Sequence, residues 1–366
     1  MIAVKSMAAF EHGGNVYEAI DPAAGFNQWL DFSANINPLG LSAAVKKSIE
    51  DNIDKLVHYP DPKGSELKRA ISQYYGVPEE EIVLGNGASE LFYVYMHAIG
   101  AKNVKIPVPS FSEYERSANA LEGNISYFYL NSEDGFTLDV SELAKSLNSI
   151  DTVMIGNPNN PTGNLLKRET VEALVKSAEK TGTNVVVDES FLDFREDREL
   201  YTVMDLVSQH DNLIVMNSLT KFYALPGLRL GFAVMKSSLR EKMEKNKDPW
   251  NVNLLAQKAG TAALKDAEYQ SRTREAVGRE APKMAKALKS IEGLKVCEPA
   301  VNFVMFNIKG RGITANELTA RMKAKGILIR DCSNYPGLDE YYVRVAVRSA
   351  EENKILLKKL EEALNG

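Results

Sequence analysis

The chain has 366 residues, of which 44% are hydrophobic and 25% charged, so it can bury a large core and exceeds the usual size of one domain. Its net charge of −5, with Lys and Arg spread along the chain, argues against nucleic acid as the main partner. The two cysteines, Cys297 and Cys332, favour a reducing compartment and give no support to a structural zinc site. No signal peptide or membrane-spanning run is recognisable, so we expect a cytoplasmic globular enzyme without a membrane partner.

The order of apolar and turn residues predicts an α/β fold. The first forty residues are rich in Gly, Asn and Pro and are expected to form an arm across a domain or subunit boundary. A helix is predicted over 45–56, where apolar residues share one helical face, and a turn over 59–62. We predict strands at 82–84, 104–108, 127–130, 152–155, 184–187, 213–216 and 229–234. Continuous apolar strands separated by helical patterns favour a mostly parallel sheet covered by helices on both faces.

The pattern changes after Trp250 to one typical of a smaller α+β domain. A long helix is predicted from about 254 to 291, and a final helix from 351. Between them we expect strands at 302–308, 327–330 and 342–347 and a helix at 317–325. We therefore predict a large cofactor-binding domain over 41–255. The second domain is expected to combine 256–366 with the N-terminal arm, 1–40.

Residues 218–229 carry the most specific chemical pattern in the chain. Ser218 precedes Lys221 by three residues, and Arg229 follows Lys221 by eight. The lysine amine can form a Schiff base with an aldehyde, while the hydroxyl and the guanidinium can hold a phosphate. This combination points to pyridoxal 5′-phosphate (PLP) as the cofactor.

Other polar residues follow the predicted strands, where ligands bind in open parallel sheets. Gly87, Ala88 and Ser89 come after the first buried strand and open a helix, so their backbone amides could hold a phosphate. An Asn-Pro-Asn-Asn-Pro-Thr-Gly loop at 157–163 and Asp188 follow two further strands. Each pattern alone is also compatible with an ordinary turn, a helix cap or a surface lysine. Their occurrence together and in this order along the chain argues against a chance combination.

This order resembles the fold-type-I PLP enzymes, the aspartate aminotransferase superfamily, over nearly the whole chain. The resemblance implies an α/β large domain with a mostly parallel sheet and a smaller α+β domain. It assigns Lys221 to the Schiff base, Asp188 to the protonated pyridine nitrogen and Asn160 to the 3′-oxygen of the ring. It also implies ring stacking by Phe111 and a homodimer. The phosphate contacts that it implies are Gly87, Ala88, Ser89, Ser218, Arg229 and, from the partner subunit, Tyr59.

Within the superfamily, the chain is similar to the histidinol-phosphate aminotransferases and to the L-threonine-O-3-phosphate decarboxylases of cobalamin biosynthesis. The segments 12–15, 31–40, 328–338 and 342–348 favour the decarboxylases. So does Phe191, which stands where many members of the superfamily carry a tyrosine that donates to the 3′-oxygen. The resemblance implies decarboxylation of O-phospho-L-threonine to (R)-1-amino-2-propanol O-2-phosphate and CO2. Phosphoserine remains an alternative substrate, and histidinol-phosphate:2-oxoglutarate transamination an alternative activity.

A substrate with a phosphate and a carboxylate needs cationic partners. Arg330 and Arg344, on two predicted C-terminal strands, are suited to bind these anions, and His12 and Asn35 of the arm could complete the site. His12 could instead be an ordinary turn residue. Arg348 could belong to a surface ion pair rather than to the anion site. A regulatory PLP-binding module and a nucleotide-binding domain are two alternative protein classes. No appended helix-turn-helix, G-x-G-x-x-G or Walker loop supports either of them.

Overall fold

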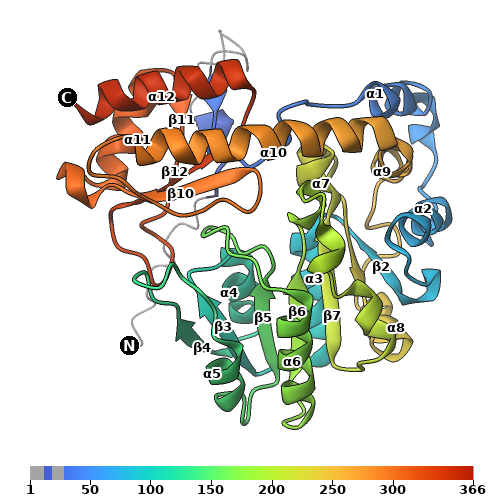
Figure 1. The fold of residues 1–366 in the computed structure, drawn as a ribbon. Helices are drawn as coiled ribbons and strands as arrows, with labels where there is room; N and C mark the ends of the chain where they lie inside the picture. Colours follow the sequence, from blue (N-terminus) through green and yellow to red (C-terminus); the bar gives the residue numbers. More distant parts are fainter. Residues whose placement is uncertain (1–11, 19–28, 366) are drawn as a thin grey trace, which may run out of the picture.

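The computed structural model describes residues 12–18 and 29–365, and its larger part is built on a seven-stranded sheet (Figure 1). The strand order is β2 (Ile82–Gly85), β8 (Gly231–Val234), β7 (Leu213–Ser218), β6 (Asn184–Asp188), β5 (Thr152–Gly156), β3 (Asn103–Val108) and β4 (Asn124–Tyr129). Only β8 runs antiparallel to its neighbours within this sheet. The central strands are apolar and buried on both sides, as expected for a parallel sheet between two helical layers.

Two apolar cores lie on the two faces of this sheet. One contains Leu91, Phe92 and Tyr95 of α3 (Ala88–Ile99), which packs beside α4 (Ser112–Asn119) and α8 (Ser237–Lys245). The other face is covered by α2 (Ser65–Tyr75), α5 (Val140–Lys145), α6 (Arg168–Glu179) and α9 (Leu254–Lys265), with α1 (Ala43–Glu50) against α9. The sheet is therefore covered on both faces, which confirms the predicted α/β class.

The long helix α10 (Ala267–Lys289) runs from the large sheet to a smaller C-terminal part (Figure 1). This part contains an antiparallel sheet in the order β12 (Arg330–Asp331), β13 (Tyr342–Ala346), β10 (Phe303–Asn307) and β9 (Lys295–Val296). The helices α11 (Ala315–Ala324) and α12 (Ala350–Leu364) pack together beside it. The arm contributes β1 (Leu30–Asp31), which pairs in parallel with β11 (Ile327–Leu328). Residues from the N-terminal arm and from the C-terminal part of the sequence therefore both contribute to this smaller part.

Local boundaries differ from the prediction in several places. The strand predicted over 327–330 is divided into β11 and β12, which belong to different sheets. The helix predicted from 254 to 291 is two helices, because Asp266 ends α9 and its side chain accepts a hydrogen bond from the Tyr269 amide as the N-cap of α10. The helix predicted over 45–56 ends at Glu50, and a 3-10 helix follows at Ile53–Val57. The remaining short helices are α7 (Leu219–Phe222) and the 3-10 helices Val16–Glu18, Glu79–Glu81, Leu192–Phe194, Arg198–Leu200, Met204–Ser208, Pro226–Leu228 and Lys309–Arg311.

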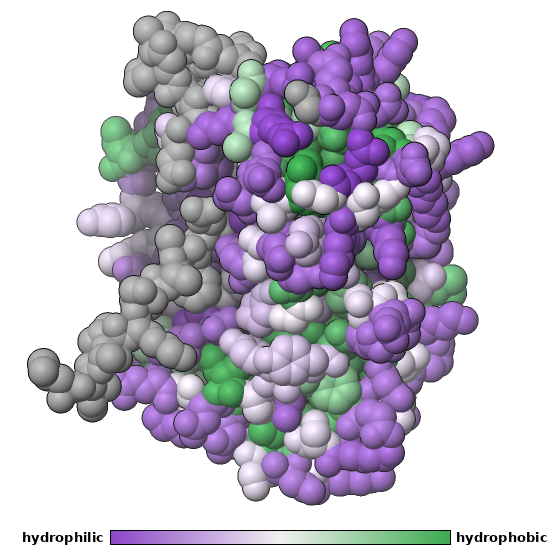
Figure 2. Space-filling model, turned by 90° about the vertical axis from the view of Figure 1, so that its left-hand side faces the viewer, coloured by the Kyte–Doolittle hydropathy of each residue, from purple (hydrophilic) through white to green (hydrophobic). Residues whose placement is uncertain are grey.

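The face of the molecule that carries the smaller part mixes hydrophilic side chains with small apolar patches (Figure 2). In the described part of the chain, no helix combines the length and the apolar character needed to cross a membrane.

Candidate active site

A cavity opens at the carboxyl ends of the central strands. These ends carry Asp188 of β6, Ser218 of β7 and the loop after β5 that holds Asn160. Parallel strands present their carboxyl ends at one edge of a sheet, so residues from distant parts of the sequence meet there. The predicted cofactor residues that line this cavity are Ala88, Ser89, Phe111, Asn160, Asp188, Ser218, Lys221 and Arg229.

Lys221 lies on α7, a helix of four residues that begins directly after β7. The Ser218 side chain caps this helix, and its Oγ lies 2.6 Å from Oγ1 of Thr220. The ammonium group donates to Thr220 Oγ1 over 3.3 Å. Burial, followed by the positive charge of Arg229, lowers the pKa of Lys221 to about 8. A lysine with such a pKa is available as a neutral nucleophile close to neutral pH.

Asp188 ends β6 and is buried. Its Oδ2 accepts a hydrogen bond from the Tyr114 hydroxyl at 2.9 Å, and its Oδ1 accepts one from the Ser190 amide at 2.9 Å. Burial raises the pKa of Asp188, while these hydrogen bonds and the positive charge of Lys221 act against that rise. A buried carboxylate in this position is suited to face a protonated ring nitrogen.

The region where Arg229 meets the N-terminus of α3 is suited to a phosphate. Gly87 has a φ of +85° and stands at the N-terminus of the twelve-residue helix α3. A Cβ atom at Gly87 would collide with the guanidinium of Arg229, so only glycine lets this arginine approach the helix N-terminus. Arg229 itself has a left-handed backbone (φ 59°), a strained conformation of the kind that concentrates at ligand sites. An aldehyde-binding lysine, a buried acid and this cradle together fit PLP.

Arg330 and Arg344 lie opposite each other on β12 and β13 and are both buried. Arg344 donates to Asn160 Oδ1 and, over 3.0 Å, to the Ser33 carbonyl, while Arg330 donates to Asn334 Oδ1 at 2.8 Å. Within the described residues, neither arginine has a carboxylate partner, and the Nε atom of each lacks a hydrogen-bond partner. Two buried guanidinium groups without counter-charges are costly, so they mark a site for an anionic ligand.

The arm residues reach the same region. Asn35 is buried, and its Oδ1 has no hydrogen-bond partner among the described residues. His12 lies beside the Phe111 ring, at 5.9 Å between centroids, and its Nε2 is 2.7 Å from Oε1 of Glu113. The structure therefore places His12 against Phe111 of the cavity lining, but it pairs His12 with an acidic side chain that the sequence did not point to.

Of three further residues, Arg348 and Tyr59 lie away from the cavity, whereas Phe191 lines it. Arg348 forms an ion pair with Glu352 at 2.7 Å, in agreement with its alternative interpretation. Tyr59 is 78% exposed and stacks on Trp250, away from the cavity of its own chain. Phe191 lines the cavity and packs edge-on against Phe303.

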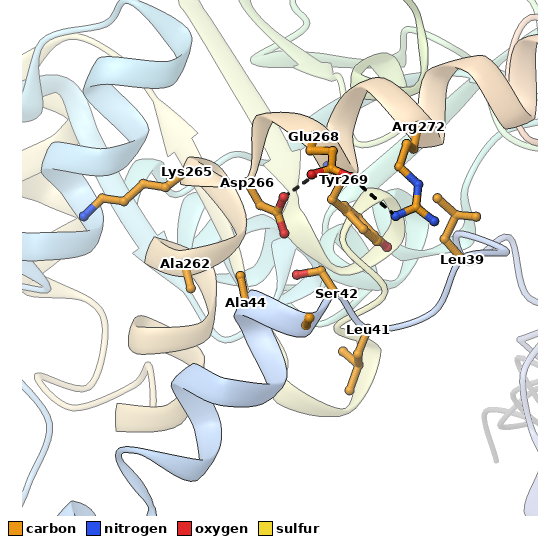
Figure 3. Close-up of a pocket in the computed structure, with 11 residues that line it drawn as sticks. Leu39, Leu41, Ser42, Ala44, Ala262, Lys265, Asp266, Glu268, Tyr269 and Arg272 are labelled. Carbon is orange, nitrogen blue, oxygen red and sulfur yellow. Dashed lines mark hydrogen bonds and ion pairs between the residues drawn. The ribbon is translucent and has the colours of Figure 1, made fainter.

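Tyr114 and Thr220 are site residues that the sequence analysis missed. Tyr114 stands three residues after Phe111, one helical turn away, and this spacing could have identified it. A separate cavity, between the start of α1 and the α9–α10 junction, contains none of the predicted site residues (Figure 3).

Residues 27–360 match the family model of class I and II aminotransferases, so the chain belongs to this family. Its cofactor is PLP, which agrees with the cavity described above. The chain is 35% identical over 368 residues to the threonine-phosphate decarboxylase of Salmonella typhimurium, which covers 98% of this chain and 99% of that protein.

Two solved structures show the same fold. The L-threonine-O-3-phosphate decarboxylase of Porphyromonas gingivalis is 28% identical, with a TM-score of 0.81 and coverage of 92% of this chain and 99% of that one. The histidinol-phosphate aminotransferase of Clostridium acetobutylicum is 30% identical, with a TM-score of 0.86 and the same two coverages. These comparisons confirm the predicted fold and superfamily.

Proposed function

We propose that the protein is a PLP-dependent decarboxylase that converts O-phospho-L-threonine to (R)-1-amino-2-propanol O-2-phosphate and CO2 in cobalamin biosynthesis. The observation that carries this proposal is the pair of buried arginines, Arg330 and Arg344, which have no carboxylate partner among the described residues. Arg344 contacts Asn160 of the cavity lining, and Arg330 lies opposite Arg344. A ligand with two anionic groups would satisfy both. Similarity to the Salmonella threonine-phosphate decarboxylase over nearly the full length of both chains supports the choice of substrate.

Two residues of the cavity, Asp188 and Lys221, have definite tasks in this reaction. When bound, PLP accepts the electron pair released as a bond at the substrate Cα breaks. Asp188 holds a proton at the ring nitrogen, which strengthens this acceptor. Lys221 would hold the aldehyde carbon until substrate binds, and its released amine would donate the proton that replaces the departing CO2 at the reacting carbon.

The arginines decide which bond is presented for cleavage. Binding of phosphate and carboxylate at two fixed guanidinium groups restricts rotation about the substrate Cα, so one bond is held in the reactive orientation. Arg344 is fixed by its hydrogen bonds to Asn160 and to the Ser33 carbonyl. We propose that Asn35 and His12 complete the anion site from the arm, with His12 exchanging Glu113 for the substrate.

Histidinol-phosphate:2-oxoglutarate aminotransferase is the second candidate, because the Clostridium acetobutylicum aminotransferase superposes with a TM-score of 0.86. Measurement of CO2 released from O-phospho-L-threonine separates the two activities, with phosphoserine as a second substrate. One extra methyl group is worth roughly 1–3 kcal/mol in an apolar pocket, so we expect phosphothreonine to be preferred. No gas, together with glutamate formed from histidinol phosphate and 2-oxoglutarate after exchange of the amino group, would establish the aminotransferase instead. Lys221→Ala is the inactive control.

We also propose a homodimer in which Tyr59 contributes to the phosphate site of the partner subunit. Its support is an exposed apolar strip beside Tyr59, formed by Ile53, Leu56, Val57 and Trp250, with Val57 82% exposed. Val57→Glu is expected to shift the protein towards monomers in light scattering and to weaken cofactor binding. A Val57→Glu dimer with normal cofactor affinity would contradict this arrangement.

A cytoplasmic location is proposed on the two free cysteines alone.

A further inference from the structure

Asn37 is a buried residue of the arm that connects three separate parts of the fold. It is 3% exposed and lies between β1 and α1. Its side-chain amide donates to the Phe222 carbonyl at 2.6 Å and to Thr273 Oγ1 at 2.7 Å. Its Oδ1 accepts the Leu39 amide at 2.9 Å. Both amide hydrogens and the carbonyl oxygen are therefore in use, so the orientation of this side chain is determined.

Asn37 contacts the C-terminal end of α7, the helix that carries the cofactor lysine. Helix α7 has only four residues, Leu219–Phe222, and the last carbonyls of any helix lack partners within it. The backbone amide of Asn37 donates to the Lys221 carbonyl at 3.1 Å, and its side chain donates to the next carbonyl, that of Phe222. One residue thus binds two consecutive carbonyls, one of which belongs to Lys221 itself.

The other contacts of this segment fix it to α10. Thr273 lies on α10, one turn after Tyr269, whose hydroxyl donates to the Gly40 carbonyl at 2.6 Å. Figure 3 shows Tyr269 extending from α10 towards the segment that carries Leu39 and Leu41. The segment from Asn37 to Gly40 is therefore anchored to the long helix at two successive turns, while Asn37 binds α7.

We propose that Asn37 is a positioning residue that holds α7, and with it Lys221, against α10 in the orientation needed for catalysis. This inference rests on the proposed role of Lys221 as the cofactor lysine. Asn37 does not itself line the cavity, and its hydrogen bonds to α7 go to backbone carbonyls rather than to Lys221 Nζ, so it acts through the backbone of α7.

Two single variants separate the contact with α7 from the contact with α10. Asn37→Asp replaces the donor that faces the Phe222 carbonyl by an acceptor, while the Thr273 hydroxyl can turn and donate to the new carboxylate. Thr273→Val removes only the contact with α10 and preserves the side-chain shape. If the carboxylate prevents folding, Asn37→Ser takes its place, because it also removes the amide donors.

Hydrogen exchange of the 366-residue chain without cofactor is the first measurement. Asn37→Asp is expected to speed exchange in the peptide that covers 219–225 at least about fivefold, and Thr273→Val to change it less than about twofold. The second measurement is steady-state kinetics with phosphothreonine. Asn37→Asp should lower kcat at least about tenfold with KM within about threefold, whereas Thr273→Val should leave kcat within about twofold.

Unchanged exchange over 219–225 in the Asn37 variant, or equal loss of kcat in both variants, would overturn the inference. The exchange result does not depend on the reaction. If Lys221→Ala retained turnover, the proposed function would fail even though faster exchange in the Asn37 variant would still establish its contact with α7.

Discussion

Replacement of Lys221 by methionine is expected to stabilise the protein in the absence of its cofactor. The amine is surrounded by protein, and burial lowers its pKa from the ordinary value of 10.5 to about 8, with the charge of Arg229 adding to the effect. The native state therefore disfavours the ammonium form, which the unfolded chain carries freely at neutral pH. Methionine has a similar length and no charge, so it removes this penalty.

The size of the effect follows from the two pKa values. A fall from 10.5 to about 8 corresponds to about 3 kcal/mol at neutral pH. The side chain is only partly buried and faces the cavity, where water can solvate the ammonium, so we expect a gain of about 1–3 kcal/mol. The loss of the 3.3 Å hydrogen bond to Thr220 reduces this gain in stability only slightly.

The sign of the pH dependence is fixed by the same values. The penalty is fully present below about pH 8, and it is lost as the pH rises from about 8 to 10.5, because the native amine is then neutral and removal of its proton costs less as the pH approaches 10.5. Wild-type protein should therefore approach the stability of Lys221→Met across this window.

Urea unfolding of the cofactor-free proteins, followed by circular dichroism at pH 7 and pH 10.5, measures the difference. Lys46→Met, at an exposed position on α1, is the matched control and should change the free energy of unfolding by less than about 0.5 kcal/mol. A Lys221 variant that is no more stable than wild type at pH 7 would refute the argument. So would a gain that persists undiminished at pH 10.5.

Three further predictions concern ligand binding and turnover. Gly87→Ala should weaken PLP binding about tenfold, because its Cβ would displace Arg229 and a φ of +85° strains alanine; cofactor titration with unchanged affinity would contradict this. Asp188→Asn should retain PLP but lower kcat about 10- to 150-fold, since a charge-assisted interaction worth about 1.5–3 kcal/mol is lost; turnover at the wild-type rate would exclude its role at the ring nitrogen. Arg344→Gln should lower kcat/KM for phosphothreonine about 100-fold with the cofactor absorption intact, whereas Arg348→Gln, which breaks only the ion pair with Glu352, should stay within about threefold. Equal losses in the two arginine variants would show that the anion site is wrongly assigned.

The sequence by itself determined the architecture and the cofactor. Runs such as Val185–Val187, bounded by a polar residue and separated by helical patterns, can be buried on both faces only in a sheet between helices. Most of the predicted cofactor residues end such a strand or follow it within a few residues, so their place at the edge of the sheet could be predicted from their neighbours in sequence. Lys221 and Asp188 belong to this group, because local patterns determine strand ends.

Only the tertiary structure decided which residues from distant segments meet. Arg344 and Arg348 are close in sequence, yet Arg344 is buried without a carboxylate partner among the described residues, whereas Arg348 is paired with Glu352. Likewise, the partnership of His12 with Glu113 and the contacts of Asn37 with Phe222 and Thr273 join segments far apart in the chain. Such contacts depend on how helices and sheets pack, and residue periodicity along one element carries no information about the element packed against it.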